Sequence, residues 1–183
     1  MNRFIENPRH VNTDIRTFIS LYEDNDRILE INPIYQRDIV WTEEQQINFI
    51  GTVMLNYPCP NIMINNDTEN NILIIMDGKQ RLTSIFKFYK NEIYWLDDNN
   101  MKVYYNKIPR ASNNIRKLTN QEKNIFCERE IQTIRYNDLS YELQVDIFER
   151  VQRGVVIRYS DLLISFFRNE NIARTFKSES DKL

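Results

Sequence analysis

Hydrophobic residues recur along the chain at two spacings, one typical of helices and one typical of strands. Helical spacing predicts helices over residues 11–24, 42–57 and 82–90, after 119, from 140 to about 154, and from 160 onward. Short apolar runs predict extended segments at residues 28–35, 61–64, 72–76, 93–96, 101–105 and 130–136. This order predicts an α+β domain with a small mixed sheet, hairpins flanked by helices, and a more helical C-terminal third.

Polar residues mark where several of these helices begin. The segments Thr42–Gln45 and Thr119–Glu122 both have the sequence of a capping box, in which the first side chain and the fourth satisfy each other's backbone amides. Asn12 or Thr13 is expected to cap the first helix. Polar turns within residues 65–71 and 97–100 predict two β-hairpins, because an expected strand lies on each side of both turns.

Composition sets limits on the class of protein. A chain of 183 residues has the size of one domain, so we expect residues 1–183 to form a single domain with a frayed polar tail at 169–183. The net charge of −2 argues against an overall basic surface that coats nucleic acid. No apolar run approaches the roughly 20 residues that cross a bilayer. Cys59 and Cys127 are too few for a disulfide framework, which favours an intracellular location, in the cytoplasm or the nucleus.

The loop between the 72–76 strand and the following helix is the strongest candidate site. It holds Asp77, Gly78, Lys79 and Arg81 at the expected start of a helix, whose positive dipole disfavours cations by about 0.3–1 kcal/mol each. A phosphate bound to the backbone amides of residues 82–84 would offset both cations. The alternative is a solvated turn in which Asp77 and Arg81 pair with each other. A P-loop is excluded, because its glycine and lysine spacing is absent.

Two further clusters carry arginines. Gln36 and Arg37 follow an extended segment, and the planar guanidinium of Arg37 suits bidentate contact with phosphate. The alternative is a salt bridge between Arg37 and a neighbouring carboxylate such as Asp38. Arg150 and Arg153 lie near the end of a predicted helix, where the helix dipole alone is enough to favour cations.

Other candidate catalytic, metal-binding and base-stacking residues have a simpler explanation or lack the partners that their chemistry needs. His10 is the only histidine, so a catalytic triad, a histidine metal site or an HNH-type nuclease would have to rest on it alone. Asp97 and Asp98 are paired carboxylates, but their context is that of an ordinary turn. Four aromatic residues could stack bases on a sheet, although such residues more often fill a core: Tyr94, Trp95, Tyr104 and Tyr105.

Taken together, the arginine clusters resemble one family. The segments are Tyr35-Gln36-Arg37 with Val40-Trp41, Asp77-Gly78-Lys79-Gln80-Arg81-Leu82-Thr83-Ser84, and Phe148-Glu149-Arg150-Val151-Gln152-Arg153-Gly154. Their order and spacing are similar to those of the GmrSD-type N-terminal domain, a family of the ParB/sulfiredoxin-like superfamily that occurs in modification-dependent restriction systems. The resemblance covers roughly residues 10–168.

The resemblance implies a compact ParB/sulfiredoxin-like fold whose Asp-Gly-x-Gln-Arg loop binds a nucleotide and supports NTP hydrolysis in restriction relatives. By position, the nucleotide loop would consist of Asp77, Gly78, Gln80 and Arg81, with Gln36, Arg37, Arg150 and Gln152 lining the same cleft. This chain departs from the family pattern at Lys79, where restriction members commonly have Gln, and at Gln152, where many have Asn. Restriction members also carry a C-terminal nuclease domain, which the sequence up to Leu183 lacks, so DNA cleavage by that route is not expected.

The sequence thus supports three hypotheses. In the first, the chain binds an NTP with Mg²⁺ and supports its hydrolysis, so the expected roles are catalysis by Asp77, Gln80 and Arg81, metal binding by Asp77, and cofactor binding by Gln36, Arg37, Gly78, Lys79, Thr83, Arg150 and Gln152. In the second, the same basic cleft binds or nicks DNA. In the third, the fold is a catalytically silent scaffold. The expected partners are nucleotide phosphate, DNA, and a second copy or a separate effector protein, with no membrane.

Overall fold

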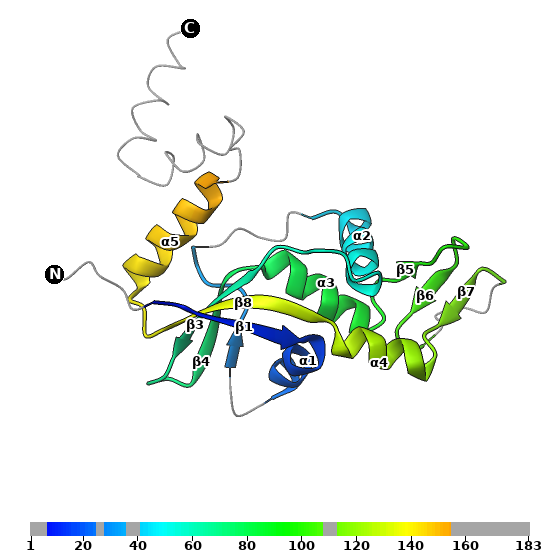
Figure 1. The fold of residues 1–183 in the computed structure, drawn as a ribbon, viewed down its shortest axis with the longest axis horizontal. Coiled ribbons are helices and arrows are strands. Elements are labelled where there is room, and N and C mark those ends of the chain that lie inside the picture. The colour runs from blue at the N-terminus through cyan, green and yellow to red at the C-terminus, as the bar shows by residue number, and fades with distance from the viewer. Residues whose placement is uncertain (1–6, 25–27, 36–40, 108–112, 155–183) are drawn as a thin grey trace, which may run out of the picture. The chain divides into compact units, whose positions relative to one another are not determined.

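Eight strands and five helices form within residues 7–24, 28–35, 41–107 and 113–154, the ranges that this computed structural model describes (Figure 1). The strands are β1 (Arg9–Asp14), β2 (Ile28–Glu30), β3 (Ile62–Asp67), β4 (Ile72–Asp77), β5 (Trp95–Leu96), β6 (Lys102–Tyr104), β7 (Ile115–Lys117) and β8 (Glu130–Asn137). The helices are α1 (Ile15–Glu23), α2 (Glu43–Met54), α3 (Lys79–Tyr89), α4 (Asn120–Glu128) and α5 (Tyr141–Gly154).

The chain divides into two units, residues 1–140 and residues 141–183, which are described separately. The first unit holds all eight described strands and helices α1 to α4, and α5 is the described helix of the second. The α+β class and the mixed sheet expected from the sequence are confirmed. No described helix is both long and apolar enough to cross a membrane.

The larger sheet has five strands in the order β1-β8-β3-β4-β2 (Figure 1). β1 pairs antiparallel with β8, β8 parallel with β3, β3 antiparallel with β4, and β4 parallel with β2. The first and last described strands of the unit therefore lie side by side at one edge. Thr13 and Thr133 join them through hydroxyls 3.1 Å apart, and Arg135 Nη2 donates to Thr13 Oγ1 at 2.8 Å.

The hairpin of β3 and β4 confirms the sequence expectation and lies at the centre of the sheet. Its strands are rich in β-branched residues, and Ile62, Ile64 and Ile75 are almost fully buried. Asn71 takes a left-handed conformation with φ of 55° in the connecting turn, as asparagine tolerates better than most residues. A register shift between Met63 and Ile64 marks a bulge close to the end of β4.

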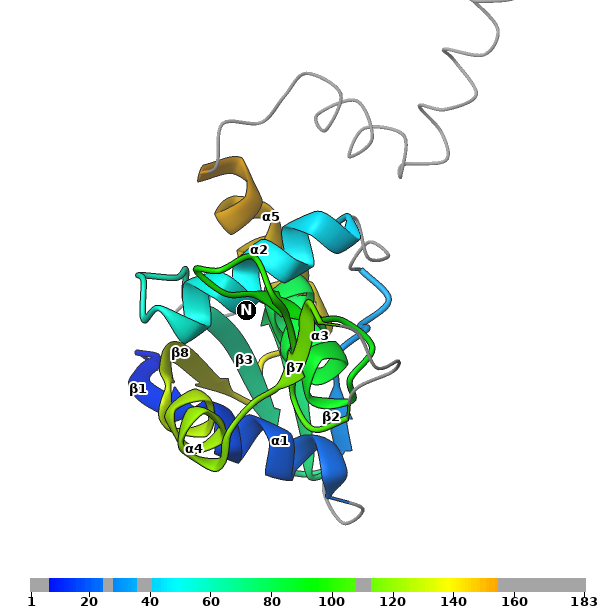
Figure 2. The same ribbon diagram turned by 90° about the vertical axis from the view of Figure 1, so that its right-hand side faces the viewer.

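Helices α1 to α4 bury their apolar faces in one hydrophobic cluster with this sheet. α3 contributes Leu82 and Ile85, α1 contributes Ile15 and Phe18, and all four side chains are fully buried. Figure 2 shows α1 and α4 side by side, and α3 packs against α2. The two expected capping boxes are confirmed, because Thr42 and Thr119 each accept a hydrogen bond from the backbone three residues on.

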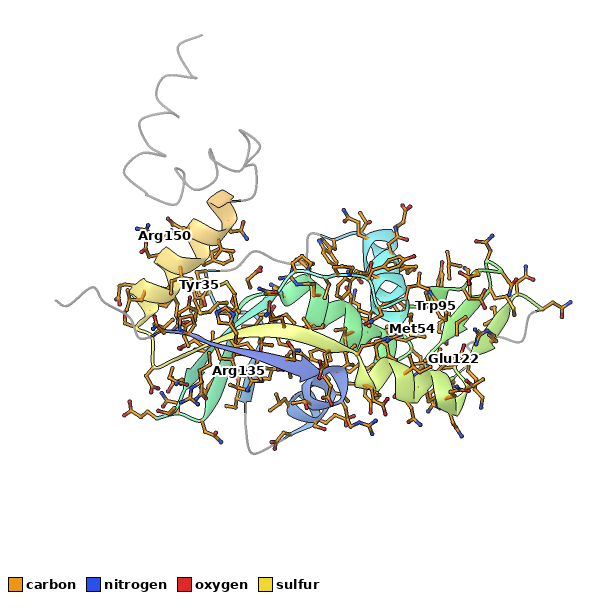
Figure 3. The ribbon with its side chains drawn as sticks, viewed as in Figure 1. Tyr35, Met54, Trp95, Glu122, Arg135 and Arg150 are labelled. Atoms are coloured by element: carbon orange, nitrogen blue, oxygen red, sulfur yellow. The ribbon has the colours of Figure 1, made fainter. Side chains whose placement is uncertain are left out.

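A second sheet, of three strands in the order β5-β6-β7, follows α3. β5 and β6 form the second expected hairpin, and its turn is held by Asp97, which accepts hydrogen bonds from the amides of Asn99 and Met101, both at 3.0 Å. Trp95 of β5 lies beside α2 (Figure 3). The sequence did not predict β7, which pairs parallel with β6.

The first part of the expected 11–24 helix is wrong. Residues 9–14 form β1, and α1 begins at Ile15 with Asp14, rather than Asn12 or Thr13, as its N-cap; the Asp14 carboxylate accepts from the amide of Thr17 at 2.8 Å. The physical reason is tertiary pairing. Residues 9–14 pair with the backbone of β8 along their whole length, and this pairing overrides their helix propensity. The helix expected from residue 160 and the tail at 169–183 lie outside the described residues.

Candidate functional site

The candidate site lies where β4 ends and α3 begins. Asp77 is the last residue of β4, and Gly78 is the N-cap of α3, in a left-handed conformation with φ of 104° and ψ of 7°. A Cβ atom on Gly78 would lie 2.8 Å from Cγ1 of Ile62 in β3. Glycine is therefore required twice over, by its backbone angle and by the close approach of β3.

The first turn of α3 is electrostatically unusual. Gly78 has no side chain to cap the helix, the first turn contains no acidic residue, and Lys79 and Arg81 both lie in it. Lys79 is only 7% exposed. Two cations at the positive end of a helix dipole cost about 0.3–1 kcal/mol each, and burial strengthens the effect. The end of this helix thus carries a positive charge that suits an anion.

Arg81 of α3 is held by the last residue of β4 and by the residue just before β3. Its Nη2 donates to Oδ2 of Asp77 at 2.7 Å and to the carbonyl oxygen of Asn61 at 2.8 Å, and its side chain is 11% exposed. The pairing of Asp77 with Arg81, which the sequence left as the alternative, is therefore present. Nε of Arg81 is nevertheless buried without a hydrogen-bond partner among the described residues. Asp77 satisfies only part of this guanidinium.

The expected use of the amides of residues 82–84 is wrong. α3 begins three residues earlier than expected, and the amide of Leu82 already donates to the carbonyl oxygen of Gly78 at 3.0 Å. The first-turn amides are those of residues 79–81, which face the end of the helix. Thr83 lies in the second turn and is half-buried, and its role as a phosphate ligand stays a prediction.

Gln80 connects this loop to the second arginine cluster. Its Oε1 accepts a hydrogen bond from the amide of Trp41 at 3.4 Å. Gln46 Nε2 in turn donates to the Trp41 carbonyl at 3.2 Å, and Lys87 Nζ donates to Gln46 Oε1 at 3.2 Å. The chain is thus fixed against α3 directly after the segment that holds Gln36 and Arg37, although these two residues lie outside the described ones.

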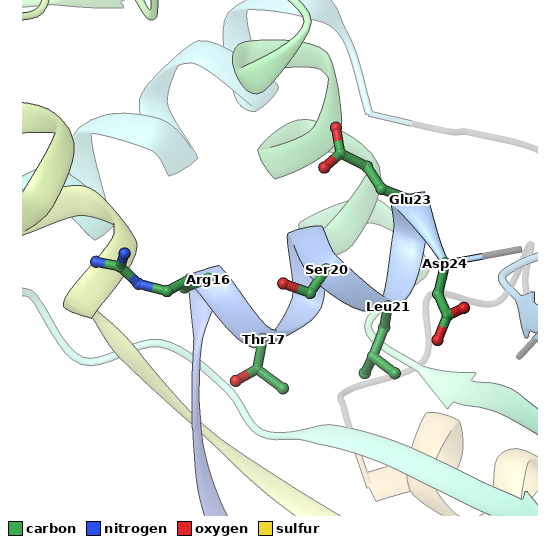
Figure 4. A pocket seen from close by; sticks show the side chains of 6 residues that line it. All are labelled: Arg16, Thr17, Ser20, Leu21, Glu23 and Asp24. Atoms are coloured by element: carbon green, nitrogen blue, oxygen red, sulfur yellow. The ribbon is translucent and has the colours of Figure 1, made fainter. Parts of the chain in front are cut away.

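A hollow of about 360 Å³ opens beside this chain of hydrogen bonds. It is lined by Trp41, Glu43, Gln46, Lys87, Glu92 and Ile93. A larger hollow of about 430 Å³ lies along α1, and Figure 4 shows its lining side chains: Arg16, Thr17, Ser20, Leu21, Glu23 and Asp24. Its walls carry charges of both signs and no motif residue.

The charge of Arg81 affects the pKa of the Cys59 thiol. Partial burial raises the pKa of the Cys59 thiol, and the nearby positive charge of Arg81 acts in the opposite direction by favouring the thiolate. Burial is the larger effect, so the thiol form is favoured. The pair shows that the charge of Arg81 is felt by neighbouring groups even though Asp77 accepts one of its hydrogen bonds.

The third cluster belongs to the second unit. Arg150 of α5 donates through Nε to both carboxylate oxygens of Asp146, at 3.0 Å, one turn earlier in the same helix. Gln152 follows in the last turn of α5. Convergence of Arg37, Arg81 and Arg150 on one ligand stays a prediction.

In the loop from Asp77 to Arg81, Asp77 is the one carboxylate that could bind a metal ion. Within the residues that the structure describes, no group of three or more His, Cys, Asp or Glu side chains could hold a metal ion. Asp77 gives one oxygen to Arg81. A single carboxylate fits Mg²⁺ only in the arrangement in which phosphate oxygens and water complete the coordination.

Sequence reasoning missed the main-chain groups of this site. The Asn61 carbonyl and the Trp41 amide hold Arg81 and Gln80, and the Ile62 side chain closes on Gly78. Backbone groups carry no side-chain signature, so only the bulge of β3 and the pairing of β3 with β4 place them here.

Comparison with known proteins gives a family match. Residues 15–182 match the family described as "GmrSD restriction endonuclease, N-terminal domain". No curated protein and no solved structure matches the chain. The matched range includes both the loop of Asp77 to Arg81 and the arginines of α5, and it spans most of the 183 residues. The chain therefore belongs to the family of GmrSD restriction endonuclease N-terminal domains.

Proposed function

We propose that the chain binds a nucleoside triphosphate through its phosphates at the loop from Asp77 to Arg81. The observation that carries the proposal is the start of α3, where Lys79 and Arg81 lie in a first turn that has neither an acidic residue nor a side-chain cap. The first-turn amides would donate to a bound phosphate, whose charge would also stabilise Lys79 and Arg81, the second of which already pairs with Asp77. The buried Nε of Arg81, which has no partner among the described residues, is a donor of the kind a phosphate oxygen accepts.

Hydrolysis of the bound NTP is the second step of the proposal. Lys79 and Arg81 would stabilise the charge that develops on the transferred phosphoryl group. Asp77 would supply the one protein carboxylate to a Mg²⁺ ion whose other ligands are phosphate oxygens and water. Gln80, whose Oε1 accepts a hydrogen bond from the Trp41 amide, would orient the attacking water.

Membership of a restriction endonuclease family supports a role in DNA defence. In this proposal the nucleotide acts as the signal or the energy source of a system that acts on DNA. Contact of the same loop with DNA phosphates is the competing function, because both ligands present the same anionic oxygens.

Calorimetric titration of the full chain with ATP, GTP, CTP and UTP, with and without MgCl₂, tests the binding step. We expect at least one nucleotide to bind wild type, and we expect Arg81→Ala to abolish binding. Arg116→Ala is the matched control, since Arg116 also forms part-buried ion pairs, with Asp97 at 3.1 Å and Glu122 at 2.9 Å, away from α3's first turn. Absence of heat for all four nucleotides with wild type refutes the proposal.

Release of inorganic phosphate tests the hydrolytic step. Asp77→Asn and Gln80→Ala should bind nucleotide yet release phosphate at least about 100-fold more slowly than wild type, as removal of one charged or positioning group typically does. Nucleotide binding without turnover in wild type would reduce the function to a nucleotide sensor. Binding of duplex DNA that nucleotide does not displace, and that Arg81→Ala weakens, would establish the competing function.

A further inference from the structure

The outer face of the three-stranded sheet carries a separate set of side chains. Strand register places Leu96, Lys102 and Ile115 in one row, and Tyr104 and Lys117 in the next. Val103 points to the opposite face and is fully buried, so the row residues face outward. Lys102, Lys117 and Leu96 are exposed, and Tyr104 and Ile115 are half-buried.

Two half-buried tyrosines lie beside a lysine on this face, and one of them, Tyr94, also packs against the hydrophobic core. The rings of Tyr94 and Tyr104 lie 5.7 Å apart between centroids, at an interplanar angle of 53°. The ammonium of Lys102 lies 4.5 Å from the centroid of the Tyr94 ring. Aromatic rings beside cations on a sheet face form the arrangement on which single-stranded nucleic acid stacks its bases and rests its phosphates.

The charge of this region differs in sign from that of the chain. Residues 93–123 contain six Lys and Arg residues and three acids, whereas the whole chain has a net charge of −2. Two of the three acids, Asp97 and Glu122, bind Arg116, which pairs with Val103 on the buried side of the sheet. The third is Asp98, in the turn after β5. Several side chains share the excess positive charge of this segment, and two of them, Lys102 and Lys117, lie on the outer face.

We propose that this outer face, formed by Tyr94, Leu96, Lys102, Tyr104, Ile115 and Lys117, binds single-stranded nucleic acid. The tyrosine rings stack on bases, and Lys102 and Lys117 contact backbone phosphates. Strand geometry places the Cα atoms of these two lysines about 8 Å apart, on adjacent strands and two positions along, so one nucleic-acid strand can reach both. A duplex keeps its base faces stacked internally and cannot use the rings, so the face favours single strands.

This surface is distinct from the loop of Asp77 to Arg81. The loop lies at the start of α3 and the three-stranded sheet follows its end, and an 11-residue helix is about 16 Å long. A ligand at one place therefore need not touch the other. The inference does not depend on the proposed nucleotide function, and the two can fail independently.

Fluorescence anisotropy of the full chain with labelled 15-nucleotide oligonucleotides tests the inference. The probes are an oligo-dT strand, an oligo-rU strand and a DNA duplex of the same length, each titrated at several salt concentrations. We expect wild type to bind at least one single strand more tightly than the duplex. Tyr104→Leu should weaken that binding by about 5- to 100-fold, the effect of losing one stacking contact. Removing Lys102 and Lys117 together should reduce the slope of log affinity against log salt concentration by about 0.7 for each lysine.

Lys90→Ala is the matched control, because Lys90 also rests over a tyrosine ring, that of Tyr22 at 4.6 Å, but lies outside the three-stranded sheet. It should leave oligonucleotide binding unchanged. Tyr104→Phe keeps the ring and should keep the affinity, which provides the test if Tyr104→Leu fails to fold. The inference is overturned if wild type binds no single strand at low salt, if it prefers the duplex, or if the double lysine variant binds like wild type.

Discussion

Replacement of Gly78 by alanine probes the backbone that positions the candidate site. Gly78 has φ of 104°, and a Cβ at this position would lie 2.8 Å from Cγ1 and 3.2 Å from Cγ2 of Ile62. Both Ile62 and Gly78 are buried, and Ile62 packs at the centre of the larger sheet, so neither can move aside easily. The substitution therefore combines a backbone penalty with a steric one.

The magnitude follows from these two contributions. A left-handed conformation costs an alanine roughly 1–2 kcal/mol, and an extra methyl group forced into a packed core costs about 1–3 kcal/mol. Gly78→Ala should therefore lower the free energy of unfolding by about 2–5 kcal/mol, a large part of the roughly 5–15 kcal/mol that a domain has. For a chain of this size the melting temperature should fall by about 4–20 °C.

Urea unfolding followed by tryptophan fluorescence measures the change, and Gly51→Ala is its control. Gly51 lies within α2, where a Cβ would lie 3.7 Å from the Trp95 ring, an ordinary contact. Alanine there should raise stability by about 0.5–1 kcal/mol, because glycine is costly inside a helix. The two substitutions are chemically identical and should have opposite signs. A Gly78→Ala variant as stable as wild type would refute this account of the loop.

A double-mutant cycle separates the two contributions to the Gly78 effect. Ile62→Ala removes Cγ1 and Cγ2, the two atoms that the new methyl group would meet most closely. The cost of Gly78→Ala should therefore be smaller by about 1–3 kcal/mol in the Ile62→Ala background than in wild type. The remaining penalty should be the backbone contribution together with the milder contact to Cβ of residue 62 at 3.3 Å. Strict additivity of the two substitutions would show that Ile62 does not oppose a side chain at this position.

Three further predictions concern a cap, a carboxylate and a thiol. Thr42→Ala should destabilise the chain by about 1 kcal/mol in urea unfolding, because it removes the N-cap of α2. The hydrogen bond from Arg116 holds the pKa of Glu122 below its usual value, against the smaller opposing effect of partial burial. This stabilisation is present above the unfolded pKa and is lost as pH falls through the folded one, so the stability gap between wild type and Glu122→Gln should shrink as pH falls below about 4.5; a gap that widens would contradict it. Arg81→Met should raise the pKa of Cys59 further, because the charge that favours its thiolate is gone. Iodoacetamide labelling of Cys59, followed by mass spectrometry, should then have its pH midpoint at a higher pH than in wild type. A lower midpoint would contradict the effect of the Arg81 charge on this thiol.

Local signals in the sequence predicted most of the fold. The capping boxes at Thr42 and Thr119, the hairpin of β3 and β4, and the bounds of β8 and α5 depend on neighbouring residues, and the structure agrees with each. The strand at residues 9–14 depends on a partner far along the chain. Its apolar spacing fits a helix, and the ladder with β8 overrides that preference.

The candidate site was predictable only as a set of residues. The order of Asp77, Gly78 and Arg81 drew attention to the loop, and the pairing of Asp77 with Arg81 was one of two stated alternatives. The burial of Lys79 and the approach of Ile62 to Gly78 come from the packing of β3 against the loop. Such long-range contacts leave no local pattern, so the helix start was placed three residues too late.

The pairing of β1 with β8 has a consequence for synthesis on the ribosome. Thr13 and Thr133, whose hydroxyls lie 3.1 Å apart between these strands, are 120 positions apart in sequence. At about 5–20 residues per second, translation takes roughly 6–24 s to pass from one to the other. Once β3 has been made, its edge on that side has no strand beside it for the rest of that interval, since its partner there is also β8. An open edge is a template for strand pairing between chains, so this interval is when a nascent chain most needs chaperone protection from association.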